Sequence, residues 1–133
     1  MIKLREAELY DTRQITLLAL KYFDDLTYDG FYMEAHENIK SDDGVIYVLV
    51  QDETIIAFTQ CKIQKGGPAI LKRICVEEEY INKQAGEKLV KKCAQWAKRK
   101  GCDTLLYNCV QEQRADIKAH NRLGFDEHKR IAL

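Results

Sequence analysis

Residues 71–89 decide the fold, and they read Leu71-Lys-Arg-Ile-Cys-Val-Glu-Glu-Glu-Tyr-Ile-Asn-Lys-Gln-Ala-Gly-Glu-Lys-Leu89. The pattern predicts a buried strand, a short polar loop and a helix that begins near a single glycine, Gly86. A helix N-terminus presents N–H groups without intrahelical acceptors and the positive end of the helix dipole, which together favour a phosphate or pyrophosphate group. The stretch therefore predicts either an anion-binding loop or an ordinary helix start, with Asn82 as N-cap and Gly86 as a packing residue.

The composition predicts one packed α/β domain over residues 1–133. Hydrophobic residues make up 46% of the chain, and the 21 Lys plus Arg balance the 21 Asp plus Glu. Zero net charge argues against a nucleic-acid partner bound by bulk phosphate neutralisation. No apolar run approaches the length of a membrane span, and the N-terminus leads directly into a strand pattern. We therefore expect a cytoplasmic protein with no membrane or nucleic-acid partner.

Cysteine and histidine usage indicates neither a disulfide framework nor a metal site. The five cysteines have no CxxC spacing and lie mostly in apolar runs, so we expect reduced thiols that pack as small hydrophobes. The three histidines have no paired ligand spacing, and we expect no metal. The cysteines are Cys61, Cys75, Cys93, Cys102 and Cys109.

Hydrophobic periodicity predicts elements in the order β-α-α-β-β-β-α-β-α-β. This order indicates an α/β (α+β) fold with a mixed sheet of about six strands flanked by about four helices. The unit 69–109 should be parallel with a right-handed crossover, and a sheet edge at 127–133 would allow a homodimer. Predicted strands cover 1–5, 45–50, 55–63, 69–76, 104–109 and 127–133. The first predicted helix is opened by a capping box of Asp11 and Gln14, and the other three cover 31–40, 82–100 and 116–123.

The element order and the motifs between Leu71 and Phe125 resemble the GNAT superfamily of acetyl-CoA-dependent N-acyltransferases. That family ends its long strand in Val-x-Pro-x-x-Arg-Gly-x-Gly-x-Gly, whereas this chain has Val76, Glu78 in place of proline, and Ile81-Asn-Lys-Gln-Ala-Gly86. Its later motif, Asn-x-x-Ala-x-x-x-x-Tyr-x-x-x-Gly-Phe, keeps its Gly-Phe but has Gln113 for asparagine and His120 for tyrosine. Within the superfamily, 95–102 and 119–127 look most like the aminoglycoside 6′-N-acetyltransferases.

The resemblance implies a binding site for acetyl-CoA as co-substrate. The strand 71–76 would splay from 104–109, so that the pantetheine arm pairs with Ile74 and Val76 as an added strand. The Ile74 N–H would polarise the thioester carbonyl. The missing arginine at Ile81 and the missing glycines imply weakened binding. The implied cofactor-binding residues are Ile74, Cys75, Val76, Ile81, Asn82, Lys83, Gln84, Ala85, Gly86, Glu87, Lys88, Gln113 and Asp116.

The resemblance also implies roles on the acceptor side of the reaction. His120 would protonate the departing thiolate; the alternative is a surface histidine one turn from Asp116. Lys72 and Asn108 stand where the aminoglycoside enzymes carry acidic residues. With Arg73 adjacent, they favour an acceptor that bears a carboxylate or phosphate over a polycation. Residues 77–79 are candidates for a base acting through water, or else a solvated acidic loop.

Two functions of different classes remain at this point. The first is an N-acetyltransferase acting on a primary amine of a small molecule or peptide. The second is a GNAT-fold CoA-binding or regulatory module with weak or absent turnover. The degenerate loop, Gln113 and the missing tyrosine favour the second, while Gly86, the intact Gly124-Phe125 and an acid-capable His120 favour the first. A protein-interaction domain without cofactor is a third, weaker possibility.

Overall fold

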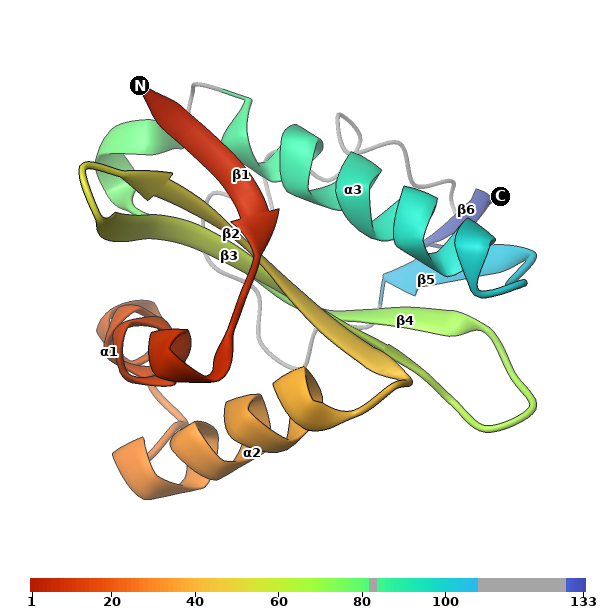
Figure 1. Cartoon of the computed structure of the whole chain (residues 1–133), viewed down its shortest axis with the longest axis horizontal. Helices are drawn as coiled ribbons and strands as arrows, with labels where there is room; N and C mark the ends of the chain where they lie inside the picture. Colours follow the sequence, from red (N-terminus) through yellow and green to blue (C-terminus); the bar gives the residue numbers. More distant parts are fainter. Residues whose placement is uncertain (82–83, 108–128) are drawn as a thin grey trace.

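A six-stranded mixed sheet with helices on both faces forms the centre of the structure (Figure 1). The structure is a computed structural model, and it describes residues 1–81, 84–107 and 129–133. The sheet order is β1-β2-β3-β4-β5-β6, and every neighbouring pair is antiparallel except β4 and β5. The strands are β1 (Ile2–Glu6), β2 (Gly44–Gln51), β3 (Thr54–Ile63), β4 (Ala69–Val76), β5 (Thr104–Tyr107) and β6 (Arg130–Ala132).

Helix α3 covers one face of the sheet, and α1 and α2 cover the other (Figure 1). Side chains alternate along a strand, so β2 supplies both cores. Val45 and Tyr47 face α3, whereas Ile46 and Val48 face α1 and α2. The helical elements are η1 (Leu9–Asp11), α1 (Thr12–Tyr22), α2 (Tyr28–Lys40), η2 (Glu78–Tyr80) and α3 (Ala85–Arg99).

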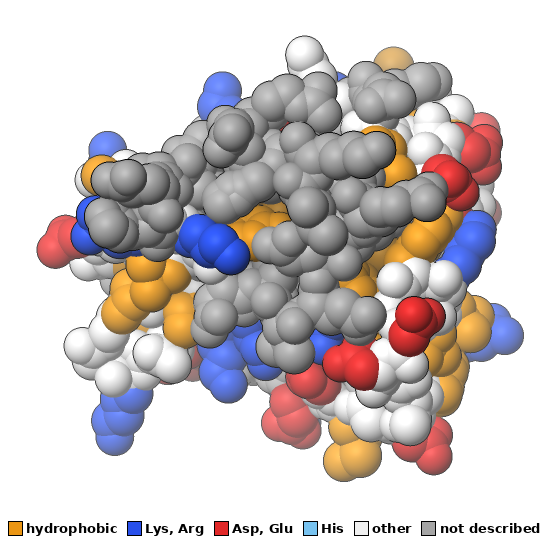
Figure 2. All heavy atoms as spheres, turned by 180° about the vertical axis from the view of Figure 1, so that it is seen from behind, with side chains coloured by type: hydrophobic (Ala, Val, Ile, Leu, Met, Phe, Trp, Pro, Cys, Tyr) orange, Lys and Arg blue, Asp and Glu red, His pale blue; other side chains and the backbone are white. Residues whose placement is uncertain are grey.

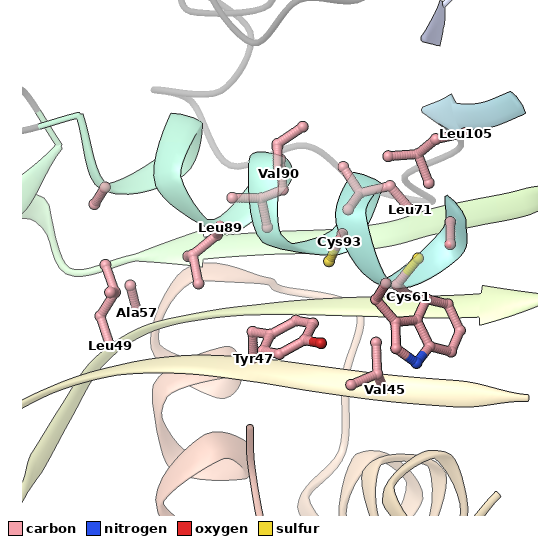
Figure 3. Close-up of a cluster of buried hydrophobic side chains, with 14 of the residues drawn as sticks. Val45, Tyr47, Leu49, Ala57, Cys61, Leu71, Leu89, Val90, Cys93 and Leu105 are labelled. Carbon is pink, nitrogen blue, oxygen red and sulfur yellow. The ribbon is translucent and has the colours of Figure 1, made fainter. Parts of the chain in front are cut away.

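The inner face of α3 is the one that the sequence predicts. Leu89 and Cys93 point from the helix toward β2, β3 and β4, where they meet Tyr47 and Leu71 (Figure 3). Because these contacts bury a continuous apolar surface, they fix α3 against the strand that precedes it. All five side chains of the predicted inner face are buried: Ala85, Leu89, Cys93, Trp96 and Ala97.

The predicted capping box at the start of α1 is wrong. The Asp11 carboxylate accepts two hydrogen bonds from Arg5, at 2.7 and 3.0 Å, and one from the Glu8 backbone N–H at 2.8 Å. A bidentate charged pair is stronger than a neutral cap, so it takes this carboxylate away from the N-cap role. Gln14 instead donates to the Glu53 carbonyl and accepts from the Ile55 N–H, which ties α1 to the β2–β3 turn.

The predicted strand–helix–strand unit is confirmed, with different helix limits. β4 and β5 pair in parallel around α3. Gly101, at a left-handed φ of 89°, ends that helix as predicted. The start of α3 lies three residues after the predicted Asn82, and α2 begins earlier than predicted because Thr27 caps it through the Gly30 N–H. The predicted fourth helix, 116–123, lies outside the described residues.

The four cysteines in the described part of the chain are free thiols, and Cys109 lies outside it. Cys61, Cys75 and Cys93 are buried, and Cys102 is half-buried. Burial raises the pKa of the Cys93 thiol, with a further contribution from Cys61, so this thiol stays protonated and packs as a hydrophobe. Among residues 1–81, 84–107 and 129–133, no helix is long and apolar enough to span a membrane.

Candidate cofactor and acceptor site

Strand β4 pairs in parallel with β5 over its first half, in the part of the chain that the structure describes. The ladder with β5 runs from the pair Ala69–Leu105 to the pair Leu71–Tyr107, and β4 then continues to Val76. On its other edge, β4 stays paired with β3 along this length. The far half of β4 therefore contains Ile74, where the resemblance places the pantetheine arm. The predicted splay also involves residues from Asn108 onward, which lie outside the described residues, and it stays a prediction.

The N-terminus of α3 follows β4 after the loop 77–84, and its N-cap residue supplies no side-chain cap. Gln84 is the N-cap and makes no side-chain hydrogen bond to the helix. The first backbone bond runs from the Lys88 N–H to the Gln84 carbonyl at 3.2 Å. The N–H groups of Ala85, Gly86 and Glu87 therefore have no intrahelical acceptor. Gly86 adds no side chain here, so this helix start has the arrangement that accepts an anion.

The residues around this helix start fit a pyrophosphate unequally. Gln84 is exposed and so leaves the helix start clear, while Ile81 packs against the α3 core and supplies no charge. Glu87 lies in the first turn, where its charge opposes an anion, and Lys88 is exposed one residue later. Asn82 is not the N-cap, contrary to the alternative that the sequence left open. Asn82 and Lys83 both lie outside the described residues.

Glu77 links the end of β4 to α1. Its carboxylate accepts from Lys21 Nζ at 2.7 Å and from the Tyr22 hydroxyl at 2.5 Å, and this hydroxyl accepts from the Glu78 N–H at 3.0 Å. Burial raises the pKa of Glu77, but the Lys21 and Tyr22 hydrogen bonds outweigh it and leave the pKa below its usual value. A carboxylate held ionised in this way is a weak base, so Glu77 is the least suited of the three acidic candidates.

The two cations of β4 have different surroundings. Lys72 is half-buried, and its Nζ lies 3.7 Å from the Glu34 carboxylate. Arg73 is only 4% exposed and lies on the opposite face from Ile74, among α1 and α2 residues. The sequence prediction named Lys72 and Asn108 as acceptor-binding residues and took Lys72 and Arg73 together as favouring an anionic acceptor. The sequence carries no signal that separates the two adjacent cations of the strand.

The structure brings the β4 residues and the α3 start together around one core. Val76 and Ala85 belong to the same buried cluster. Six predicted site residues lie outside the described residues: Asn82, Lys83, Asn108, Gln113, Asp116 and His120.

Solved acetyltransferases share this fold at low sequence identity. The aminoglycoside acetyltransferase AAC(6')-Iy, in complex with a CoA-containing bisubstrate analogue, is 17% identical with a TM-score of 0.82, over 100% of this chain and 96% of that one. AAC(6')-Ih from Acinetobacter baumannii is 19% identical with a TM-score of 0.81, over 100% and 96%. The glucosamine-6-phosphate N-acetyltransferase from Arabidopsis thaliana is 20% identical with a TM-score of 0.74, over 96% and 92%.

The family assignment comes from the sequence itself. No curated protein matches the chain. The model of the acetyltransferase (GNAT) family, however, matches residues 8–125, which is most of the chain. The chain therefore belongs to the GNAT family of acetyltransferases.

Proposed function

We propose that this protein transfers the acetyl group of acetyl-CoA to a primary amine of a small molecule or peptide. The observation that carries the proposal is the N-terminus of α3, where the N-cap Gln84 makes no side-chain bond to the helix, one loop after β4 in a chain of the GNAT family. A helix start of this kind suits an anionic group, and the far half of β4 contains Ile74, where the resemblance places the pantetheine arm.

The proposed cofactor site uses mostly backbone groups. The first-turn amides of α3 hold the pyrophosphate, and the backbone of Ile74 and Val76 aligns the pantetheine arm. The Ile74 N–H donates to the thioester oxygen as negative charge develops there. Because these are main-chain groups, the unusual side chains at positions 72–75 leave the roles intact.

The transfer needs one new bond and two proton movements. The neutral amine nitrogen forms a bond with the thioester carbon, and the carbon–sulfur bond breaks. The thiolate takes a proton from His120, while the nitrogen loses one to solvent, directly or through Glu78 or Glu79. The products are an amide and the free thiol of CoA.

A CoA-binding regulatory module is the second candidate. Ile81 packs into the α3 core instead of offering a charge, and Gln84 holds a left-handed conformation that glycine would adopt more readily. Both features weaken a pyrophosphate loop. We also expect a cytoplasmic location, no metal, and either a monomer or a homodimer formed along β6, which is the last strand in the order of the described sheet.

Thiol release from acetyl-CoA across a panel of amines tests the proposal. We expect turnover with at least one amine, and we expect His120→Phe to lower kcat by about 100-fold or more, the usual contribution of a general acid. His128→Phe is the matched control and should retain activity. Unchanged acetylation in His120→Phe would remove His120 from the mechanism. Binding of acetyl-CoA without thiol release for any amine would favour the regulatory module.

A further inference from the structure

Arg73 places a positive charge in the apolar layer between the sheet and the helices α1 and α2. Its side chain is 4% exposed. The guanidinium carbon lies 5.1 Å from the ring centre of Phe23, just after α1, and 5.5 Å from that of Phe31, in the first turns of α2. Both rings are themselves buried. The centres of two aromatic rings thus lie within 5.5 Å of a guanidinium that has almost no access to water.

The charge of Arg73 has no counter-ion in the described part of the chain. Its Nε and Nη1 are buried and donate no hydrogen bond. The ion pairs found among the described residues join Arg5 to Asp11, Lys21 to Glu77 and Lys72 to Glu34. A guanidinium stays charged in proteins, and a buried unpaired charge is strongly destabilising. Contacts with aromatic rings recover only part of that cost.

The groups next to Arg73 leave this cation available. Gln60 is its partner across the β3–β4 ladder and is fully buried, and its Oε1 also lacks a hydrogen-bond partner. The Glu34 carboxylate is already engaged, because it accepts from Gln60 Nε2 at 3.0 Å and pairs with Lys72. Lys72 is thus neutralised at the surface, whereas Arg73 carries the uncompensated charge inside.

We propose that Arg73 binds the carboxylate or phosphate of the amine that this protein acetylates. This inference rests on the proposed function, since it uses the Ile74 N–H as the position of the thioester. Arg73 precedes Ile74 in β4, and its side chain reaches the face toward α1 and α2. An anion beside the guanidinium would supply the missing counter-ion, and a guanidinium fork suits both carboxylate and phosphate.

The surface near Arg73 favours an acceptor that carries an ammonium group as well as an anionic group over one that carries only an anion. Acidic side chains gather toward the lower right of the face in Figure 2, on the side of the molecule formed by α1 and α2. Asp24 and Asp25, both exposed, directly follow Phe23. Such a surface attracts an ammonium group, while the buried guanidinium selects the attached anion.

Matched acceptors with and without an anion test this specificity. The pairs are 4-aminobutyrate against butylamine and phosphoethanolamine against ethanolamine. We expect kcat/KM to favour at least one of the two anionic members by about 100-fold or more, because a site built to pair a buried polar group rejects the analogue that lacks it. Arg73→Met should abolish this preference by raising KM for the anionic amines. Arg73→Lys, which keeps the charge but loses the fork, should retain part of it. Lys62→Met, an exposed cation on β3, is the control.

A thermal-melting series keeps the inference separate from the acetyltransferase proposal. Without ligand, Arg73→Met should melt above the wild type, because a buried unpaired charge is gone. The preferred of 4-aminobutyrate and phosphoethanolamine should raise the melting temperature of the wild type and of Lys62→Met but not that of Arg73→Met. Equal shifts in Arg73→Met, no shift in the wild type, or equal kcat/KM for charged and neutral amines would each overturn the anion site. If no amine is acetylated, the acetyltransferase proposal fails and this series still decides the role of Arg73.

Discussion

Gln84 is the residue where the candidate cofactor loop departs most clearly from an unstrained backbone. It caps α3 at φ 59° and ψ 23°, a conformation in which a Cβ is crowded. The family motif has a glycine in this part of the loop. The side chain is exposed and gains no capping bond in return, so the strain has no compensating contact on this helix.

We expect Gln84→Gly to stabilise the protein by about 1 kcal/mol and to tighten acetyl-CoA binding. Removing the Cβ relieves the left-handed strain, although the added freedom of the unfolded chain offsets part of the gain. Chemical denaturation and a calorimetric titration measure the two effects. Gln84→Ala keeps the Cβ and is the matched control. A glycine variant no more stable than the alanine variant would show that position 84 is unstrained.

At the residue scale, sequence reasoning succeeded where one local rule decides the conformation. Gly101 ends α3 at positive φ because glycine adopts that region without a penalty. Sequence reasoning failed where a distant partner competes: Arg5 forms hydrogen bonds with the Asp11 carboxylate that was predicted to cap α1. The difference between Lys72 and Arg73 is of the same kind, because only the packing shows which cation has a carboxylate nearby.

At the scale of elements, a contact between α1 and the end of β4 fixes the position of this helix relative to the strand that carries Arg73 and Ile74. Lys21 and Tyr22, in the last turn of α1, both donate to Glu77, directly after β4. A further bond runs from the Glu77 N–H to the Ile56 carbonyl of β3 at 2.8 Å. The Phe23 ring over Arg73 follows this anchored turn, so the anchor also positions the proposed acceptor side.

We expect Glu77→Gln to lower the melting temperature by a few degrees at neutral pH. Because the pKa of Glu77 lies below its usual value of 4.5, the unfolded chain binds more protons than the folded one on acidification. The stability that Glu77 contributes is thus complete above about pH 4.5 and is lost as the pH falls through the lower folded-state pKa. Melting curves from pH 7 to pH 3 should show the two proteins converging. A constant difference across this range would mean that the carboxylate charge plays no part.

Element order was predictable from the sequence because strands and helices leave different hydrophobic periods. The β-branched apolar run 45–50 and the helical spacing from Ala85 to Ala97 both match buried elements of the structure. Element limits were less predictable. A helix start depends on its cap, and Thr27 and Gln84 start α2 and α3 at positions that periodicity does not mark.

At the scale of the whole molecule, the sheet order places the candidate cofactor and acceptor groups on adjacent parts of one strand. β4 lies between β3 and β5, and its two faces belong to different cores. Ile74 faces the α3 core, while Arg73 faces α1 and α2. One strand can therefore align a thioester through its backbone and select an acceptor through a side chain.

The family and the fold followed from sequence patterns that span the whole chain, whereas the site did not. Gly86 and the strand before it indicated where a cofactor would bind. The acceptor-binding role was assigned to Lys72 and Asn108, because a sequence shows charge but not burial. We propose Arg73 for this role, since its burial next to Phe23 and Phe31 is seen only in the structure.

A calorimetric titration of acetyl-CoA into the wild type and Gly86→Val tests the central claim most directly. The wild type should bind one equivalent per chain, and Gly86→Val should bind at least about tenfold more weakly, a loss of about 1.4 kcal/mol, because its side chain crowds the first-turn amides of α3. Gln95→Val, an exposed position later in α3, should bind like the wild type. Absence of binding to the folded wild type, or equal affinity in Gly86→Val, would contradict a cofactor site at this helix start.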